Sequence, residues 1–231
     1  MVAIDEPAAN PFSFSECFIV PKPTGKTAAN LRELLQTLRE VNERVLYYHL
    51  WQFRMAIASP AVEYPNDFAI WAATAAQESR LAEKFSAIDP FGYENWEEVR
   101  EALIDVMEEY LWDLPYITWV RPGYEFYFCE AATVVLRSRV TAQTLPEFCA
   151  AIGKVGLDSI YYHSIDARWR LRSIHLDDFS NWIKVSYGLP ELVAAIQGID
   201  ISFYTLDEIR TTIVDLCTKH LDHLHGQAQR T

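Results

Sequence analysis

Glycine is scarce in this chain, with 8 in 231 residues, and four familiar catalytic or nucleotide-binding patterns are absent. These are GxGxxG, GxxxxGK followed by Ser or Thr, GxSxG and HExxH. Because phosphate-holding loops are built on glycine, this scarcity argues against a nucleotide cofactor, and we expect no cofactor. Residues 24–27 read TGKT but lack the first glycine and a preceding strand, so we interpret them as a turn before the first helix.

Cysteine is also sparse, and the four cysteines stand far apart at positions 17, 129, 149 and 217. Structural zinc sites use closely spaced ligand pairs, and secreted disulfide scaffolds are much richer in cysteine. We therefore interpret these cysteines as small core residues of a protein in a reducing compartment, and predict a cytoplasmic location.

Positive charge is the third deficit, because 20 Lys and Arg face 32 Asp and Glu, which gives a net charge of −12. Binding to nucleic acid or to an anionic membrane surface needs clustered cations, so we expect neither partner. No stretch approaches the roughly 18 to 20 apolar residues of a membrane span. The first residues, MVAIDEP, carry acids where a signal peptide has cations.

The composition is otherwise that of a folded protein, with 50% hydrophobic residues, and the sequence repeats itself. Three segments recur at an offset of 114 residues: Phe12-Ser-Phe14-Ser-Glu16 as Phe126-Tyr-Phe128-Cys-Glu130, Tyr47-Tyr48-His49 as Tyr161-Tyr162-His163, and Arg54 as Arg168. The offset falls to 111 after Ala58 and to 110 after Pro90. A nearly constant offset with small gaps in loops indicates an internal duplication.

The duplication predicts the domain organisation. We interpret the chain as an N-terminal tail (1–11), a first helical repeat (12–113), a connector (114–125), a second helical repeat (126–225) and a C-terminal tail (226–231).

Matched helices are the strongest structural prediction. Leu31, Leu34, Leu35 and Leu38 follow the spacing of an amphipathic helix, and residues 145–152 repeat that pattern. Capping sequences of the form Asn/Thr-x-x-Glu begin these helices and two later ones, at Asn30, Thr144, Asn95 and Thr205.

Further helices are expected over 43–57 and 157–171, over 66–78 and 177–187, and over 81–88 and 192–199. Residues 12–20 and 126–136 fit either short strands or a first helix, and periodicity does not choose between them. The predicted fold class is all-α, with two tandem copies of a small helical bundle.

Several segments together resemble a known family. They are Phe14-Ser-Glu16-Cys17, Thr24-Gly25-x-x-Ala28-x-Asn30-Leu31, Tyr47-Tyr48-His49, Asn66-Asp67-Phe68-x-x-Trp71 and Leu81-Ala82-Glu83-Lys84. The chain resembles an uncharacterised prokaryotic family that carries a domain of unknown function, often in tandem. Some members are labelled by association with trehalose or glycosyltransferase genes. The second copy departs from the pattern, with Arg139 for Gly25 and Asp177 for Asn66. The resemblance implies no established activity and no catalytic residues, and at most a cytoplasmic accessory role in saccharide metabolism.

Eight polar residues retained in both copies have no local structural explanation. They are Glu16 and Glu130, Tyr48 and Tyr162, His49 and His163, and Arg54 and Arg168. One interpretation makes them a ligand site, with histidine as a base or ligand contact and arginine on an anion. The other makes them structural, with packed tyrosines, hydrogen-bonded histidines and a Glu–Arg ion pair within each copy. The structural interpretation is preferred, and no residue is assigned a catalytic role.

His220, His223 and His225 have spacing that could suit a metal, but His220 occupies the core position that Tyr110 fills in the first copy. We therefore predict no metal site.

Two functional hypotheses follow. The first is a non-enzymatic interaction or regulatory module that binds a protein partner or itself, because 7 tryptophans exceed what two small cores need. The alternative is a small-ligand binder or enzyme, with a site between the repeats built from the paired Tyr, His and Arg residues.

Overall fold

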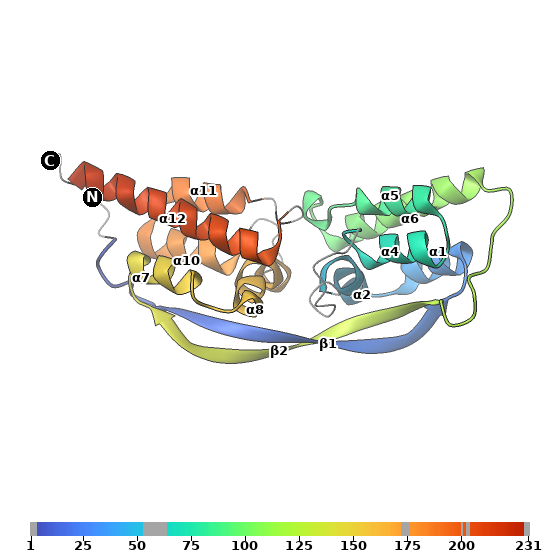
Figure 1. The fold of residues 1–231 in the computed structure, drawn as a ribbon, viewed down its shortest axis with the longest axis horizontal. Coiled ribbons are helices and arrows are strands. Elements are labelled where there is room, and N and C mark those ends of the chain that lie inside the picture. The colour runs from blue at the N-terminus through green and yellow to red at the C-terminus, as the bar shows by residue number, and fades with distance from the viewer. Residues whose placement is uncertain (1–3, 53–63, 172–175, 200, 202–203, 229–231) are drawn as a thin grey trace. The chain divides into compact units, whose positions relative to one another are not determined.

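The computed structural model describes residues 4–52, 64–171, 176–199, 201 and 204–228, and it divides into two compact units. Unit 1 comprises Met1–Phe18 and Val135–Thr231, and unit 2 comprises Ile19–Val134. The ribbon of each unit is drawn in Figure 1.

The all-α prediction is wrong, because the chain contains a two-stranded antiparallel sheet made of β1 (Phe12–Ala28) and β2 (Phe126–Ala142). The pairing brings the Thr24 hydroxyl within 2.7 Å of the Phe128 carbonyl and the Lys22 ammonium within 3.1 Å of Glu130. Both segments that periodicity left undecided are therefore strands, and each is longer than expected. Residues 24–27, interpreted as a turn, belong to β1.

Periodicity does not choose between strand and helix for these segments because only the first strand residues alternate. Phe12 and Phe14 are buried, but the stretch from Val20 to Thr27 is exposed or nearly so on both faces. An exposed two-stranded ribbon imposes no alternation of apolar and polar residues. Pro21 and Pro23 also argue against a strand, although proline is tolerated where a strand edge is open.

Unit 2 holds the first set of helical elements. They are α1 (Leu31–Glu40), α2 (Glu43–Tyr47), the π-helical turn η1 (Tyr48–Gln52), α4 (Asp67–Thr74), α5 (Ser79–Ser86), the short 3-10 turn η2 (Pro90–Gly92) and α6 (Trp96–Asp113). The predicted caps of α1 and α6 are confirmed, since the side chains of Asn30 and Asn95 accept backbone N–H groups of the first turn.

Unit 1 holds the matching set. Its helical elements are α7 (Leu145–Ile152), α8 (Leu157–Ile160), the π-helical turn η3 (Tyr161–Asp166), α9 (Ala167–Arg170), α10 (Asp178–Tyr187), α11 (Pro190–Gln197) and α12 (Leu206–Ala228). Thr144 caps α7 as predicted, and the Thr205 hydroxyl accepts the Glu208 N–H at the start of α12.

The helices predicted over 43–57 and 157–171 are not continuous α-helices over the described residues, and 53–57 lie outside them. In both units the backbone changes to a π-helical turn at the repeated Tyr-Tyr-His segment. Such turns are rare and often occur at functional positions, so they direct attention to these residues.

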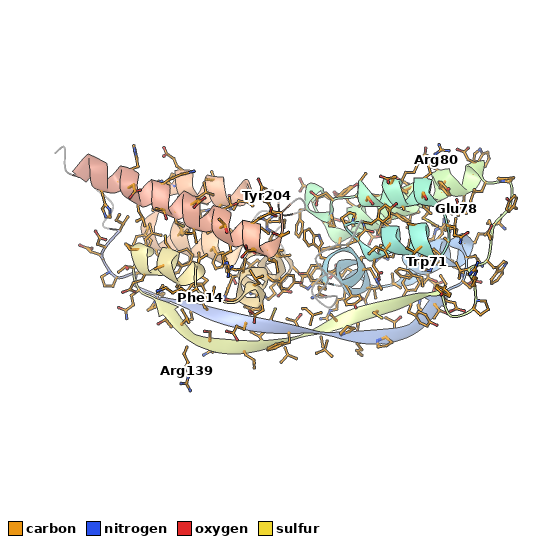
Figure 2. All side chains as sticks on the ribbon, viewed as in Figure 1. Phe14, Trp71, Glu78, Arg80, Arg139 and Tyr204 are labelled. Carbon is orange, nitrogen blue, oxygen red and sulfur yellow. The ribbon has the colours of Figure 1, made fainter. Side chains whose placement is uncertain are left out.

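Each hydrophobic core is completed by the start of a strand from the other sequence repeat. In unit 2, the Phe126 ring of β2 stacks on Phe68 of α4, with 5.0 Å between ring centroids. In unit 1, the Phe12 ring of β1 lies 5.1 Å from Phe148 of α7. Figure 2 shows Phe14 on the helix side of the ribbon and Arg139 on the opposite side. Burying one such ring contributes about 1.5–3 kcal/mol, so the strand starts are integral to both cores.

The segment predicted as an N-terminal tail packs on unit 1. Ile4 is buried, the Trp182 indole N–H donates to the Asn10 carbonyl at 2.8 Å, and the Tyr187 hydroxyl donates to the Glu6 carbonyl at 3.2 Å. In unit 2 the connector occupies a similar position, since the Trp71 indole N–H donates to the Tyr124 carbonyl at 2.8 Å.

Within the described ranges, no helix combines the length and the apolar character that crossing a bilayer requires.

Candidate functional site

His49 has both ring nitrogens bonded. Its ring is fully buried in η1, with Nδ1 2.6 Å from Oδ2 of Asp67 and Nε2 2.9 Å from the backbone nitrogen of Cys129. Because a backbone N–H can only donate, Nε2 must accept this bond. The ring proton therefore lies on Nδ1 and is donated to the Asp67 carboxylate.

His163 repeats this arrangement in unit 1. Nδ1 lies 2.7 Å from Oδ2 of Asp178, and Nε2 accepts the backbone N–H of Ser15 at 2.8 Å. The same reasoning places the ring proton on Nδ1. Each histidine thus joins the helical part of its unit to the strand that arrives from the other repeat.

This geometry favours the structural interpretation of the two histidines. A general base needs a free nitrogen lone pair near its substrate, and both Nε2 lone pairs accept backbone N–H groups. The catalytic alternative for His49 and His163 stays a prediction, and the described contacts do not support it.

Asp67 and Asp178 are the first residues of α4 and α10, where a carboxylate can accept backbone N–H groups. The caps are instead their neighbours Asn66 and Asp177, which leaves Asp67 and Asp178 free to bind the histidines. Burial raises the pKa of Asp178, but the hydrogen bonds from His163 and Arg170 outweigh burial and lower it overall. Their recurrence at the offset of 111 was the signal that could have paired them with the histidines.

Tyr48 and Tyr162 lie beside these histidines, with ring centroids 4.9 Å from the imidazole in both units. Burial, with smaller contributions from Cys129 and Asp67, raises the pKa of Tyr48 to about 12. Tyr48 is therefore a neutral phenol at physiological pH. This is consistent with a packing role and does not suit an acid–base group at neutral pH.

Of the two predicted Glu–Arg ion pairs, only Glu130 with Arg168 lies wholly within the described residues. Glu130 pairs with Lys22 at 3.1 Å, and its hydrogen bond to Lys22 lowers the pKa of the carboxyl. Arg168, its expected partner, belongs to unit 1, whereas Glu130 belongs to unit 2. Glu16 is half-buried on β1, and Arg54 lies outside the described residues.

Arg168 is buried in α9 near Asp177 of the α10 cap. Burial raises the pKa of Asp177, and the positive charge of Arg168 partly offsets that rise. Arg168 therefore contributes to the electrostatics of a buried helix start.

Arg170 was not singled out by sequence, yet it organises a polar cluster in unit 1. Its guanidinium binds Asp166 at 3.0 Å and Asp178 at 2.7 Å, and it lies 4.1 Å from the centroid of the Tyr162 ring. The Asp166-x-x-x-Arg170 spacing on one helical face could have suggested the first pair. This cluster places a cation over the Tyr162 ring and a second donor on the carboxylate that holds His163.

The cysteines and the C-terminal histidines offer little chemistry. Burial, with Asp166 and Asp158 nearby, raises the pKa of the Cys17 thiol to about 12, so it is a poor nucleophile at neutral pH. Among the residues that the structure describes, no three His, Cys, Asp or Glu side chains are placed to share a metal ion.

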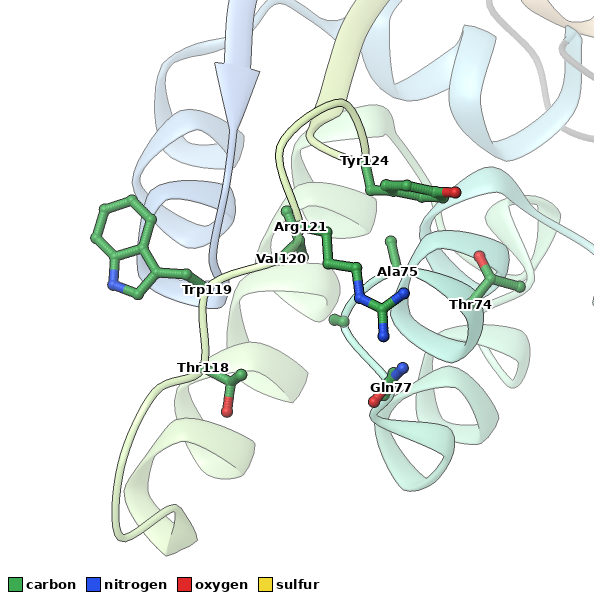
Figure 3. A pocket seen from close by; sticks show the side chains of 9 residues that line it. Thr74, Ala75, Gln77, Thr118, Trp119, Val120, Arg121 and Tyr124 are labelled. Carbon is green, nitrogen blue, oxygen red and sulfur yellow. The ribbon is translucent and has the colours of Figure 1, made fainter.

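A pocket opens on unit 2, between the end of α4 and the connector, with a volume of about 370 Å³. Its lining residues are Thr74, Ala75, Ala76, Gln77, Thr118, Trp119, Val120, Arg121 and Tyr124. Figure 3 shows the Arg121 guanidinium between the Tyr124 ring and the Gln77 side chain, whereas the Trp119 indole points away from them. Sequence alone does not indicate this pocket, because the pocket joins residues more than forty positions apart.

Comparisons with known proteins place the chain in a family. A model of a family of unknown function, DUF5752, matches residues 9–218, so this chain belongs to that family. No curated protein matches the chain.

The chain is also similar to a solved structure, that of OrfY from Thermoproteus tenax. The two share 27% sequence identity with a TM-score of 0.78, over 93% of this chain and 97% of that one. The predicted membership of an uncharacterised family is thus confirmed, without any indication of activity.

Proposed function

We propose that the chain is a non-enzymatic interaction module that binds a partner protein through exposed aromatic residues at the end of α6 and on the connector. The main support for this proposal is the solvent exposure of three aromatic side chains, which is 90% for Trp112, 74% for Tyr116 and 66% for Trp119. We call these three residues the aromatic surface. Large aromatic side chains are costly to leave in water, and they are enriched at the centres of protein interfaces.

Charge favours a different protein over a second copy as the occupant of this surface. Each chain carries a net charge of −12, so self-association would bring two strongly acidic molecules together. Asp113 and Glu109 lie beside the aromatic residues at the end of α6. We therefore infer a partner with basic residues around an apolar centre.

The test compares the native chain with a triple variant, Trp112→Ala, Tyr116→Ala and Trp119→Ala. A tagged chain captures proteins from a lysate of its own cells, and the binding of each captured protein is then measured with purified components by calorimetry. Loss of the aromatic surface should weaken binding about 30-fold or more, as expected for interface hot spots. Added salt should also weaken binding to a basic partner.

The matched control is Val185→Ala with Tyr204→Ala in unit 1, whose side chains are 73% and 42% exposed. This variant should keep the binding of the native chain. Unchanged binding by the triple variant would refute the proposal. It would also be refuted if light scattering showed that the native chain and the control variant are dimers and that the triple variant is a monomer, because the aromatic surface would then bind a second copy.

The alternative hypothesis, a ligand or catalytic site built from the paired Tyr, His and Arg residues, has weaker support because the histidine nitrogens are already bonded. The association with trehalose or glycosyltransferase genes and the cytoplasmic location remain predictions from sequence.

A further inference from the structure

Gln77, in the pocket of unit 2, has a backbone conformation that favours glycine. Its φ is +61°, and it lies in the turn after α4, three residues past Thr74, where the Glu78 N–H donates to the Ala72 carbonyl at 2.8 Å. At the matched position of the second repeat, Gly188 ends α10 with a φ of +62°. The second repeat thus has the same left-handed backbone at this position without any side chain.

The Gln77 side chain is therefore not required by the turn, and it is kept at a conformational cost. A left-handed backbone strains a residue with a side chain, whereas glycine adopts it freely. Backbone strain of this kind concentrates at binding sites. Gln77 extends toward the same space as Arg121 (Figure 3).

Arg121 offers hydrogen-bond donors in this pocket. Across the described part of the chain its guanidinium takes part in no ion pair or hydrogen bond, and its backbone carbonyl accepts the Tyr124 N–H at 3.0 Å. The two carboxylates that lie nearest to the lining segments in the sequence accept hydrogen bonds from groups other than Arg121. Glu78 accepts the Tyr110 hydroxyl at 2.6 Å, and Glu125 accepts the Gly123 N–H at 2.8 Å.

From these observations we propose that the pocket binds a small organic molecule with a single carboxylate. The planar guanidinium of Arg121 matches a carboxylate through two parallel hydrogen bonds. The Gln77 amide supplies a further donor, and the Tyr124 ring and Ala75 supply apolar contact for the carbon part of the ligand. A volume of about 370 Å³ lies in the range of small-molecule sites.

The surrounding charge limits the ligand to one negative charge. The pocket lies at the C-terminal end of α4, where the helix dipole is negative and the last carbonyls point outward. A single guanidinium offsets one carboxylate there, whereas a phosphate dianion would need additional cations.

The test uses benzoate as a probe, with benzamide as its neutral analogue and inorganic phosphate as a dianion. The Arg121 Nε–H and Gln77 amide signals are followed by NMR during titration. Benzoate should shift both signals with a Kd of about 1 mM, typical of a ligand with so few atoms. Benzamide and phosphate should bind at least about tenfold more weakly. Equal shifts with either compound would overturn the proposal.

Three variants complete the test. Arg121→Gln should abolish binding of benzoate, and the matched control Arg139→Gln, an exposed arginine on β2 in unit 1, should keep it. Gln77→Gly should raise the melting temperature and weaken binding several-fold. A higher melting temperature with unchanged binding would show that Gln77 serves no ligand. A double variant of the aromatic surface, Trp112→Ala with Tyr116→Ala, changes no residue of the pocket lining and should still bind benzoate, so this proposal and the proposed function fail independently.

Discussion

Each buried imidazole ring acts as a two-sided hydrogen-bond connector. His49 donates from Nδ1 to a carboxylate on one element and accepts at Nε2 from a backbone N–H on another. A buried backbone N–H without a partner costs free energy comparable to a lost hydrogen bond. The histidine therefore provides the acceptor for a strand N–H group, and His163 does the same for Ser15 in unit 1.

Replacing His49 by alanine should lower the free energy of unfolding of unit 2 by about 2–4 kcal/mol. The substitution leaves Asp67 and the Cys129 N–H without their partner and opens a cavity beside Phe126, whose ring centroid lies 4.6 Å from that of the imidazole. Urea unfolding followed by tryptophan fluorescence measures the change.

The matched control is His225→Ala, because this exposed histidine in α12 contacts only Asp5, at 3.7 Å, among the residues described. Its effect should stay within about 0.5 kcal/mol. If His49→Ala proved as harmless as the control, His49 would be available for ligand binding after all.

At the scale of elements, sequence predicted those features of the helices that depend on interactions between neighbouring residues. The cap of α1 depends only on Asn30 and the first turn of the same helix. Three or four neighbouring residues in the sequence are therefore enough to identify the cap. The four-leucine stripe of α1 likewise reports its own buried face, and all four leucines are buried.

Contacts distant in the sequence were not predictable in this way. The pairing of β1 with β2 and the Arg121 pocket both depend on residues that only the fold brings together. A ribbon exposed on both faces shows no alternation from which a strand could be inferred. Sequence singles out the two retained histidines as candidates, but it does not indicate their backbone partners on the strand of the other repeat.

Helix ends provide an element-scale prediction. Gly188 ends α10 with positive φ, and a methyl group there would meet no atom within 4 Å. Gly188→Ala should therefore lower stability by about 1 kcal/mol through backbone strain alone. Thermal unfolding measures this effect, with Ala195→Gly in the middle of α11 as a helix-propensity control of similar size. A stability gain in Gly188→Ala would contradict the left-handed helix end.

At the scale of the whole molecule, the compact units and the sequence repeats are divided differently. Sequence predicts repeats at 12–113 and 126–225, whereas each compact unit combines the helices of one repeat with the strand start of the other. The ring contacts of Phe12 in unit 1 and Phe126 in unit 2 follow this exchange. Exchange of an identical element between two copies is the arrangement found in domain-swapped dimers, here within one chain.

The most direct test of this exchange is an NMR measurement of scalar couplings across the N–H···N hydrogen bonds of the two histidines. The account predicts one coupling between the Cys129 amide nitrogen and His49 Nε2, and one between the Ser15 amide nitrogen and His163 Nε2. If each repeat kept its own strand, the couplings would instead join Ser15 to His49 and Cys129 to His163, and that result would contradict the exchanged fold.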